Sequence, residues 1–297
     1  MLFLRTIPKR NAALLACCVA LLVAAAGCGS SGPPAPGEST GSATATHSET
    51  SITWVIERRA LDSLYADGVS ADELSTIFNN SNTYIVGSPG ATDKVLSISR
   101  WSSHRTVTTT NLRVSGVSGD VSAMLYDDEH WSLTPAAQQL DPAKYLAQGR
   151  QLAQSKGLVY IAAPASDLVD VLAPADSGTV DERYLRLDII AEAARYADIV
   201  DIQAQGLEGN TAKYVTFVTQ AAEQARKANP GVKVLAGVST NPSGHAISAQ
   251  TFATDANDVR GVVDGFWLNI PSGGTACPTC GTAQPQVAEP WLGQLAG

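Results

Sequence analysis

Between Ala197 and Pro271, three short apolar runs alternate with two longer segments of helical periodicity. The runs are rich in Val and Ile, and they cover residues 197–205, 232–240 and 262–271. This alternation predicts the order β-α-β-α-β, because consecutive parallel strands need long crossover connections that are usually helical. The second half of the chain is therefore predicted to form a parallel sheet covered by helices.

Further elements are expected before and after this stretch. Helical spacing predicts helices over Val55–Tyr65, Ala71–Phe78, Pro142–Ser155, Arg183–Tyr196 and Val287–Leu295. Strands are expected at Tyr84–Val86, Val95–Ser99, Val121–Tyr126 and Leu158–Ala162, whereas residues 106–120 fit no single element. Ser70 and Asp141 have the positions of helix N-caps.

The element count and length fit a TIM-type (β/α) barrel. The pattern gives about six or seven strands, and each later strand is followed by a helix. The glycine-rich loops that bind nucleotides in open parallel sheets are absent from the sequence. We therefore expect the α/β class, with a barrel that is irregular in its first third and forms one domain over residues 52–297.

The N-terminus has the pattern of a bacterial lipoprotein. Three basic residues precede an apolar run from Ala12 to Ala26 that is short for a membrane span, which predicts a signal peptide over residues 1–27. Small residues before Cys28 resemble a lipobox, so we expect Cys28 to carry the lipid, including palmitate, and to hold the protein at the outer face of the cytoplasmic membrane. Cleavage without lipidation would instead give a secreted protein. Residues 28–51 are rich in Ser, Gly, Thr and Pro and are predicted to be a disordered tether.

The acidic net charge of the chain argues against binding to nucleic acid or to anionic lipids. Without residues 1–27, the chain has 17 Lys and Arg against 28 Asp and Glu. A strongly acidic protein is repelled by nucleic acid and by anionic lipids, so no nucleic-acid partner is expected. His104, His130 and His245 have no metal-site spacing, and neither a metal nor a cofactor is expected.

Cys277 and Cys280 form a Cys-Pro-Thr-Cys pair. Outside the cytoplasm, two thiols this close are usually oxidised, which predicts a disulfide that closes a Gly- and Pro-rich loop. A redox role and a zinc site are the alternatives. The pair does not lie between a strand and a helix, as redox pairs of this spacing do, and zinc needs about four ligands.

The clearest candidate for catalysis follows the predicted strand that ends at Tyr126. Asp127 and Glu129 lie there, and Glu208 follows a different strand whose end should open onto the same rim. Glycoside hydrolysis uses a proton donor and a second carboxylate, so we predict Glu129 as one catalytic residue, with Glu208 or Asp127 as its partner. The alternative is that these strand-end acids cap a loop or a helix, or are simply solvated.

Polar and aromatic residues at other predicted strand ends could bind a hydroxyl-rich ligand. The ligand-binding candidates are Tyr126, Trp131, Gln203, Gln205, Trp267 and Asn269. Amides can exchange hydrogen bonds with hydroxyl groups, and aromatic rings offer flat apolar faces for a sugar ring. The tryptophans could equally complete the core, and Asp201 could form a structural ion pair with Arg100.

Five segments of the sequence resemble those of a known group of proteins. They are Tyr126-Asp-Asp-Glu-His-Trp-Ser-Leu-Thr-Pro135, Val200-Asp-Ile-Gln-Ala-Gln205, Leu235-Ala-Gly-Val-Ser-Thr-Asn-Pro242, Val263-Asp-Gly-Phe-Trp-Leu-Asn269 and Cys277-Pro-Thr-Cys-Gly281. With them, the chain from about Ser118 onward resembles a group of actinobacterial secreted proteins and lipoproteins of unassigned function. This resemblance implies an extracytoplasmic barrel and no particular activity. The chain is more distantly similar to chitinase-type glycoside hydrolases, but their Asp-x-x-Asp-x-Asp-x-Glu signature is missing.

Three functions fit this pattern. The first is a surface-anchored, glycoside hydrolase-like enzyme that acts on glycans through paired carboxylates. The second is a non-catalytic lipoprotein that binds a glycan or another small ligand at the same rim. The third is a structural envelope lipoprotein whose rim is filled by side chains.

Overall fold

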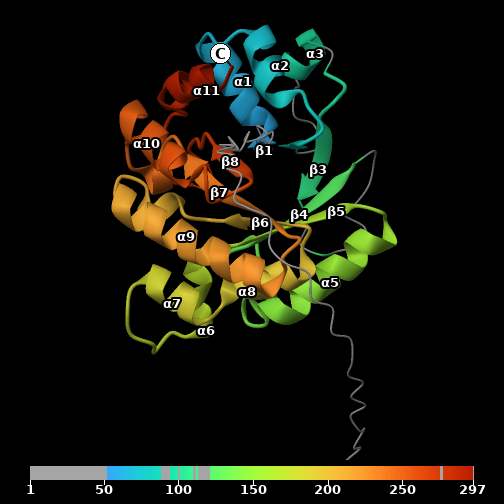
Figure 1. Ribbon diagram of the computed structural model, residues 1–297, viewed down its shortest axis with the longest axis vertical. Helices are drawn as coiled ribbons and strands as arrows, with labels where there is room; N and C mark the ends of the chain where they lie inside the picture. The colour runs from blue at the N-terminus through green and yellow to red at the C-terminus, as the bar shows by residue number, and fades with distance from the viewer. Residues whose placement is uncertain are drawn as a thin grey trace, which may run out of the picture. The chain divides into compact units, whose positions relative to one another are not determined.

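Within the part of the chain that the structure describes, eight strands form a closed ring in which every neighbouring pair is parallel (Figure 1). This computed structural model describes residues 52–87, 94–99, 101–109, 112, 121–274 and 277–296. The strands are β1 Thr53–Glu57, β2 Thr83–Val86, β3 Arg105–Thr109, β4 Ala123–Asp128, β5 Val159–Pro164, β6 Ile199–Ile202, β7 Lys233–Ser239 and β8 Gly265–Asn269. The predicted TIM-type α/β barrel is confirmed, whereas the signal peptide, Cys28 and the tether lie outside the described residues.

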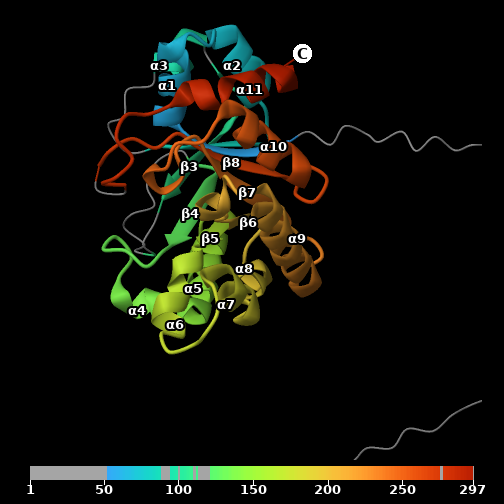
Figure 2. The same ribbon diagram turned by 90° about the vertical axis from the view of Figure 1, so that its left-hand side faces the viewer.

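Helices lie outside the ring, and among the described elements they occur between all successive strands except β3 and β4 (Figures 1 and 2). The first half contains α1 Arg58–Asp67, α2 Ala71–Phe78, α3 Lys94–Ser99, α4 Ala136–Gln139 and α5 Pro142–Ser155. Between β5 and β6 lie the 3-10 helix η2 Ser166–Leu168 and the helices α6 Val169–Leu172, α7 Val180–Arg186 and α8 Ile189–Tyr196. The remaining elements are η3 Gln205–Leu207, α9 Thr211–Ala228, η4 Pro242–Gly244, α10 Ala249–Val259, η5 Pro285–Val287 and α11 Glu289–Ala296.

Two predicted helices have the predicted bounds, and their caps explain why. The Ser70 side chain accepts a hydrogen bond from the backbone N–H of Glu73 at 3.2 Å, and α2 begins at the next residue. Asp141 caps α5 in the same way, and Pro142 occupies the first turn, where its missing N–H costs nothing. The two N-cap predictions are confirmed.

Three element predictions are wrong. The segment predicted as one helix from Val55 contains β1 followed directly by α1, so the first strand was missed. Val95–Ser99 belongs to α3 although its residues alternate like a strand. The helix predicted over residues 183–196 is two helices, separated at Asp188, whose φ of 51° interrupts the helical backbone. The irregularity expected in the first third does not reach the strands, because β1, β2 and β3 pair in regular parallel register.

Apolar side chains fill the interior of the barrel toward the amino ends of the strands, whereas polar side chains lie toward the carboxyl ends. Val55, Leu125, Ile161, Ile199 and Leu235 belong to one buried cluster contributed by strands around the ring. Side chains of a strand alternate between its two faces, so residues two positions further along also point inward. On β4 that position is Asp127, which lies toward the carboxyl end of the barrel.

Asp201 is an exception inside this apolar interior. It is 0% exposed, and neither carboxyl oxygen has a hydrogen-bond partner among the described residues. Burial raises the pKa of Asp201 well above its ordinary value, because a charge here would be desolvated. Arg100, its predicted ion-pair partner, lies outside the described residues.

Replacing Asp201 with Asn should therefore change how stability depends on pH. The folded wild type keeps a proton on Asp201 that the unfolded chain has already lost above about pH 4. Between about pH 4 and the higher pKa of Asp201 in the folded protein, raising the pH lowers the free energy of unfolding of the wild type by up to about 1.4 kcal/mol per pH unit. Asn cannot ionise, so Asp201→Asn should gain stability over the wild type as pH rises. Urea denaturation at pH 5, 6, 7 and 8 would measure this gain, and a difference that is constant with pH would contradict it.

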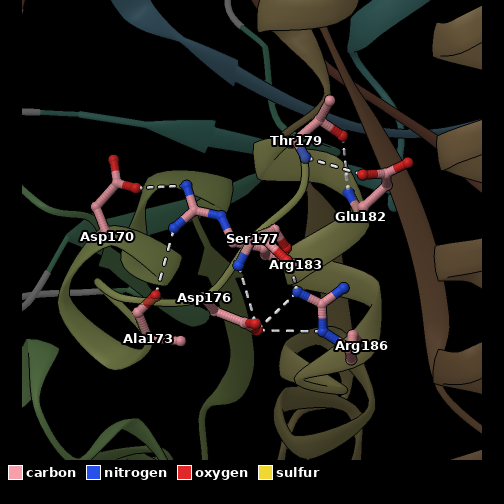
Figure 3. A network of polar contacts seen from close by, with 8 residues as sticks. All are labelled: Asp170, Ala173, Asp176, Ser177, Thr179, Glu182, Arg183 and Arg186. Atoms are coloured by element: carbon pink, nitrogen blue, oxygen red, sulfur yellow. Dashed lines mark hydrogen bonds and ion pairs between the residues drawn. The ribbon is translucent and has the colours of Figure 1, made fainter.

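The crossover between β5 and β6 is fixed by a polar network (Figure 3). Arg183 on α7 donates to Asp170 on α6 at 2.6 Å, and Arg186 donates to Asp176 at 2.6 Å in the intervening loop. Thr179 begins α7 with a complete capping box. These contacts anchor the segment that follows η2, a short helix that reaches the mouth of the barrel.

Candidate functional site

A cavity of about 700 Å³ opens where the barrel strands end. Of the residues predicted as catalytic or ligand-binding, those on its lining are Asp127, Glu129, Trp131, Gln203, Gln205, Trp267 and Asn269. They come from β4, β6 and β8 or from the segments that follow these strands. The carboxyl ends of barrel strands are where this fold builds its sites, and the sequence-based expectation of one shared rim for these seven residues agrees with this geometry.

Asp127 and Glu129 form a carboxyl pair on one wall. Asp127 points into the barrel, Asp128 points to the opposite face and is 1% exposed, and Glu129 follows directly after β4. The carboxyl groups of Asp127 and Glu129 lie close enough for each to shift the pKa of the other. Gln203 holds the pair in place, because its Nε2 donates to Asp127 Oδ1 at 2.7 Å and to the carbonyl oxygen of Ala163 at 2.9 Å.

The surroundings of this pair favour a bound proton. Desolvation raises the pKa of Asp127 well above its ordinary value, and the neighbouring Glu129 adds to the rise. Desolvation also raises the pKa of Glu129 to about 7, with a further contribution from Asp167. Two carboxyl groups in contact cannot both ionise easily, so the pair retains one shared proton near neutral pH. Such a pair can donate a proton to a ligand in the cavity.

Two tryptophans present ring surface to the cavity. Trp131 is half-buried, and its indole N–H donates to Thr134 Oγ1 at 2.8 Å, which fixes the ring. Gln139 secures the same loop, because its Nε2 donates to the carbonyl oxygen of Trp131 at 2.8 Å. Trp267 points inward from β8 and is 6% exposed. Aromatic rings on a cavity lining can serve as stacking surfaces for an apolar ligand face.

The side-chain amides of Gln205 and Asn269 also line the cavity. Gln205 lies beside β7, and Asn269 ends β8. Gln205 follows β6, and a Cβ at Gly237 on β7 would lie only 2.4 Å from its Nε2. Glycine at position 237 therefore provides the space that Gln205 occupies. Asn269 ends β8 and pairs in register with Ser239 at the end of β7, and both residues line the cavity.

Glu208 and Tyr126 do not lie on the cavity lining. Both carboxylate oxygens of Glu208 accept from the backbone N–H of Ser239, at 3.1 and 2.9 Å, so this side chain ties η3 to the end of β7. Desolvation raises the pKa of Glu208 well above its ordinary value. Tyr126 faces the helices, is 1% exposed and donates from its hydroxyl to Gln138 Oε1 at 3.3 Å.

The opposite wall was missed by the sequence analysis. It consists of Glu57 at the end of β1 and of one face of α1 with Arg59, Asp62 and Ser63. These residues were assigned to a single helix, so no strand end was expected there. The apolar β-branched run that precedes Glu57 is the signal that could have revealed β1 and its polar end.

The loop after β8 completes the cavity and contains the predicted disulfide. Cys277 and Cys280 are bonded to each other and both lie on the lining, so the disulfide prediction is confirmed. Asn241 donates to the carbonyl oxygen of Cys280 at 2.5 Å, and Thr279 donates to the carbonyl oxygen of Ser243 at 3.3 Å. The disulfide and these contacts fasten the loop to η4.

The described residues contain neither a cluster of metal-binding side chains nor a helix that could cross a membrane. Residues 52–87, 94–99, 101–109, 112, 121–274 and 277–296 contain no group of three or more His, Cys, Asp or Glu side chains placed to hold a metal ion. In the same ranges, no helix combines the length and apolar character needed to cross a membrane.

Comparison with known proteins does not assign the chain to a family. Neither a protein-family model nor a curated protein matches the chain. Among solved structures, a candidate α-L-fucosidase from Bacteroides thetaiotaomicron is 9% identical, with 82% of this chain and 94% of that chain covered and a TM-score of 0.48. The carboxyl transferase domain of Rhizobium etli pyruvate carboxylase is 11% identical over 84% of this chain and 47% of that chain, with a TM-score of 0.46. A chitinase of glycoside hydrolase family 18 from Pseudoalteromonas aurantia is 10% identical over 73% and 93%, with a TM-score of 0.43. At this level of similarity, none of the three fixes a reaction for this chain.

Proposed function

We propose that this protein is an extracytoplasmic, lipid-anchored hydrolase of glycosidic bonds in which the Asp127–Glu129 pair donates the proton to the leaving oxygen. The observation that carries the proposal is the pair of interacting carboxyl groups on the wall of the barrel cavity, with the pKa of Glu129 raised to about 7. Cleavage of a glycosidic bond near neutral pH needs an acid that remains protonated there, and an ordinary carboxyl group does not.

The rest of the lining suits a sugar. Trp131 and Trp267 offer flat ring surfaces, and Gln205 and Asn269 offer amide groups that can exchange hydrogen bonds with hydroxyls. The cavity volume of about 700 Å³ lies within the usual range for sites that bind small molecules. Stacking and hydroxyl recognition together favour a polyhydroxylated ring over a purely apolar ligand.

The proposed location rests on the sequence and on the disulfide. The pair Cys277–Cys280 is oxidised, which fits an oxidising compartment outside the cytoplasm. Cys28 is the proposed site of lipidation. We expect that Cys28→Ser releases the protein into the culture medium, whereas the wild type fractionates with membranes and contains a diacylglyceryl group by mass spectrometry. A wild type found in the medium without lipid would leave secretion as the location.

Turnover on a panel of glycans tests the activity. The purified domain from residue 52 onward would be incubated at pH 6 with neutral and charged cell-wall and plant polysaccharides and oligosaccharides, and new reducing ends would be quantified. We expect release from at least one neutral glycan, and no release by Glu129→Gln. Saturable glycan binding without any turnover would contradict the hydrolase proposal and support the non-catalytic binding protein.

Glu208 and Asp127 are the two predicted partners of Glu129, and their positions lead to different expectations. Glu208→Gln should keep turnover within about threefold of the wild type, because its carboxylate contacts the Ser239 backbone and not the cavity. Its cost should be structural, roughly 1 kcal/mol of unfolding free energy for a weakened buried hydrogen bond. Asp127→Asn should lower turnover at least tenfold, because it removes the partner with which Glu129 shares its proton. Kinetics and urea denaturation of both variants would test this difference, and a larger turnover loss in Glu208→Gln would contradict it.

A further inference from the structure

Hydrolysis by the proposed acid pair needs a second carboxylate across the sugar, and this inference rests on that proposed function. One carboxyl group protonates the leaving oxygen, and a separate carboxylate must either attack the sugar or activate a water molecule on its other face. Asp127 and Glu129 line the cavity from the same strand end and influence each other's ionisation, so in the proposed function they act together as one acid on one wall. The second group has to come from elsewhere on the lining.

Three further carboxylates lie on the described lining, and two of them are engaged. Asp62 Oδ1 accepts from the backbone N–H of Val95 at 3.3 Å, at the start of α3. Asp167 Oδ1 accepts from the backbone N–H of His130 at 3.0 Å, beside Glu129 and on the same wall. The third is Glu57, whose carboxylate has no hydrogen bond or ion pair with any described residue.

Glu57 also faces the correct direction. It is the last residue of β1, two positions after the inward-pointing Val55, so it points toward the barrel axis. In the ring, β2 and β3 separate β1 from β4, which places the two strands about 14 Å apart along the wall at ~4.8 Å per strand spacing. Glu57 and the acid pair therefore line the same cavity from strands that are not neighbours in the ring.

The charge next to Glu57 matches a role as a base. Desolvation raises the pKa of Glu57 above its ordinary value, and the nearby Arg59 guanidinium opposes that rise. A base must be more easily ionised than the acid that works opposite it. Arg59 favours the ionised form of Glu57, whereas Asp167 favours the protonated form of Glu129.

We propose that Glu57 is the general base that activates the hydrolytic water, so that the reaction inverts the configuration of the sugar. The Glu57 carboxylate takes a proton from a water molecule while the water oxygen forms a bond to the anomeric carbon. The bond from that carbon to the glycosidic oxygen breaks, and the acid pair protonates the departing oxygen. Glu57 ends protonated and the pair ends with one proton fewer, and both states are restored by exchange with solvent.

A glycosyl fluoride separates the two roles, because fluoride leaves without being protonated and needs only the base. The probe is the fluoride of the sugar that the wild type releases from the glycan panel, and fluoride release is followed with an ion-selective electrode. Glu129→Gln should hydrolyse the fluoride within about tenfold of the wild type although it fails on the glycan. Glu57→Gln should lose at least 100-fold on both substrates, within the usual range for removal of a general base. The matched control is Asp176→Asn, which removes a surface carboxylate in the network of Figure 3 and should keep both activities.

Two further readouts keep the test decisive. Circular dichroism melting would show whether Glu57→Gln is folded, and Glu57→Asp, which keeps the carboxylate but shortens it, should recover part of the activity. Proton NMR of the first product released by the wild type should show the anomer opposite to that of the substrate. Retained configuration, or a folded Glu57→Gln that hydrolyses both substrates at nearly wild-type rate, would overturn the role of Glu57 and leave the hydrolase proposal standing. A wild type that hydrolyses no glycan would overturn both.

Discussion

Replacing Glu129 with Gln is expected to lower kcat/KM for glycan hydrolysis by about 10²- to 10⁴-fold, the usual contribution of a positioned general acid. Gln has nearly the same shape and can still hydrogen bond to Asp127, but it has no proton to give to a leaving oxygen. Ligand binding should therefore persist, and isothermal titration calorimetry with the panel substrate would measure it. Loss of binding together with turnover would mean that Glu129 only holds the ligand.

The role of Glu129 as an acid also predicts the direction in which kcat/KM changes with pH. The acid works when protonated, and the pKa of Glu129 is raised to about 7 by desolvation and by Asp167. The kcat/KM of the wild type should therefore fall as pH rises above about 7, by up to tenfold per unit. Asp167→Asn removes a negative charge beside Glu129, so its activity should begin to fall at a lower pH. A profile that rises through pH 7 would contradict the assignment of the pair as the acid.

The largest expected effect on stability comes from Trp291→Ala. Trp291 lies on α11, is 0% exposed and makes edge-to-face ring contacts with Trp54 on β1, Phe252 on α10 and Phe266 on β8, at centroid distances of 5.7, 5.6 and 5.1 Å. Its indole N–H donates to Asn257 at 3.0 Å. The last helix is thereby packed against α10 and α2 at the outside of the barrel (Figure 2).

Removing this ring should lower the free energy of unfolding by about 3–5 kcal/mol, because a cavity remains and three aromatic contacts are lost. That is a large part of the roughly 5–15 kcal/mol that stabilises a typical domain. Urea denaturation followed by circular dichroism would measure it. Trp291→Phe should lose less, because a ring remains in place, and Leu140→Ala should lose less than about 0.5 kcal/mol at its 62% exposed position. A loss below about 1 kcal/mol for Trp291→Ala would show that α11 is not a structural part of the barrel.

The barrel was predictable because its second half repeats the β-α unit with clear periodicity. The first third was not, and the reasons are local. At Glu57 the strand passes into α1 without a turn, so the two elements read as one helix. At Lys94–Ser99 the alternation of Val, Ile and Ser suggests a strand, but the segment packs as a helix near α1 and α2. Packing against neighbours decides such short segments, and a single sequence does not contain that information.

The site could be predicted only as far as strand ends determine it. Seven of the nine predicted catalytic and ligand-binding residues line one cavity, because parallel strands bring their carboxyl ends together. Glu208 also follows a strand, but η3 turns it toward the backbone of Ser239, and no sequence pattern indicates that turn. Tyr126 lies one residue before Asp127 and so points to the other face of β4. Glu57 was not predicted as a site residue because it ends β1, a strand that the sequence pattern does not separate from α1.

A carboxyl titration tests, without any substrate, whether Asp127 and Glu129 share a proton. The ¹³C chemical shifts of the Asp and Glu side-chain carboxyl carbons would be followed by NMR from pH 3 to 9 in the wild type and in Asp127→Asn. We expect the pair to titrate in two coupled steps, with the Glu129 resonance changing near pH 7, and we expect Asp127→Asn to leave a single step. A Glu129 resonance that titrates in one step near its ordinary pKa of about 4.3, and is unchanged in Asp127→Asn, would contradict the account.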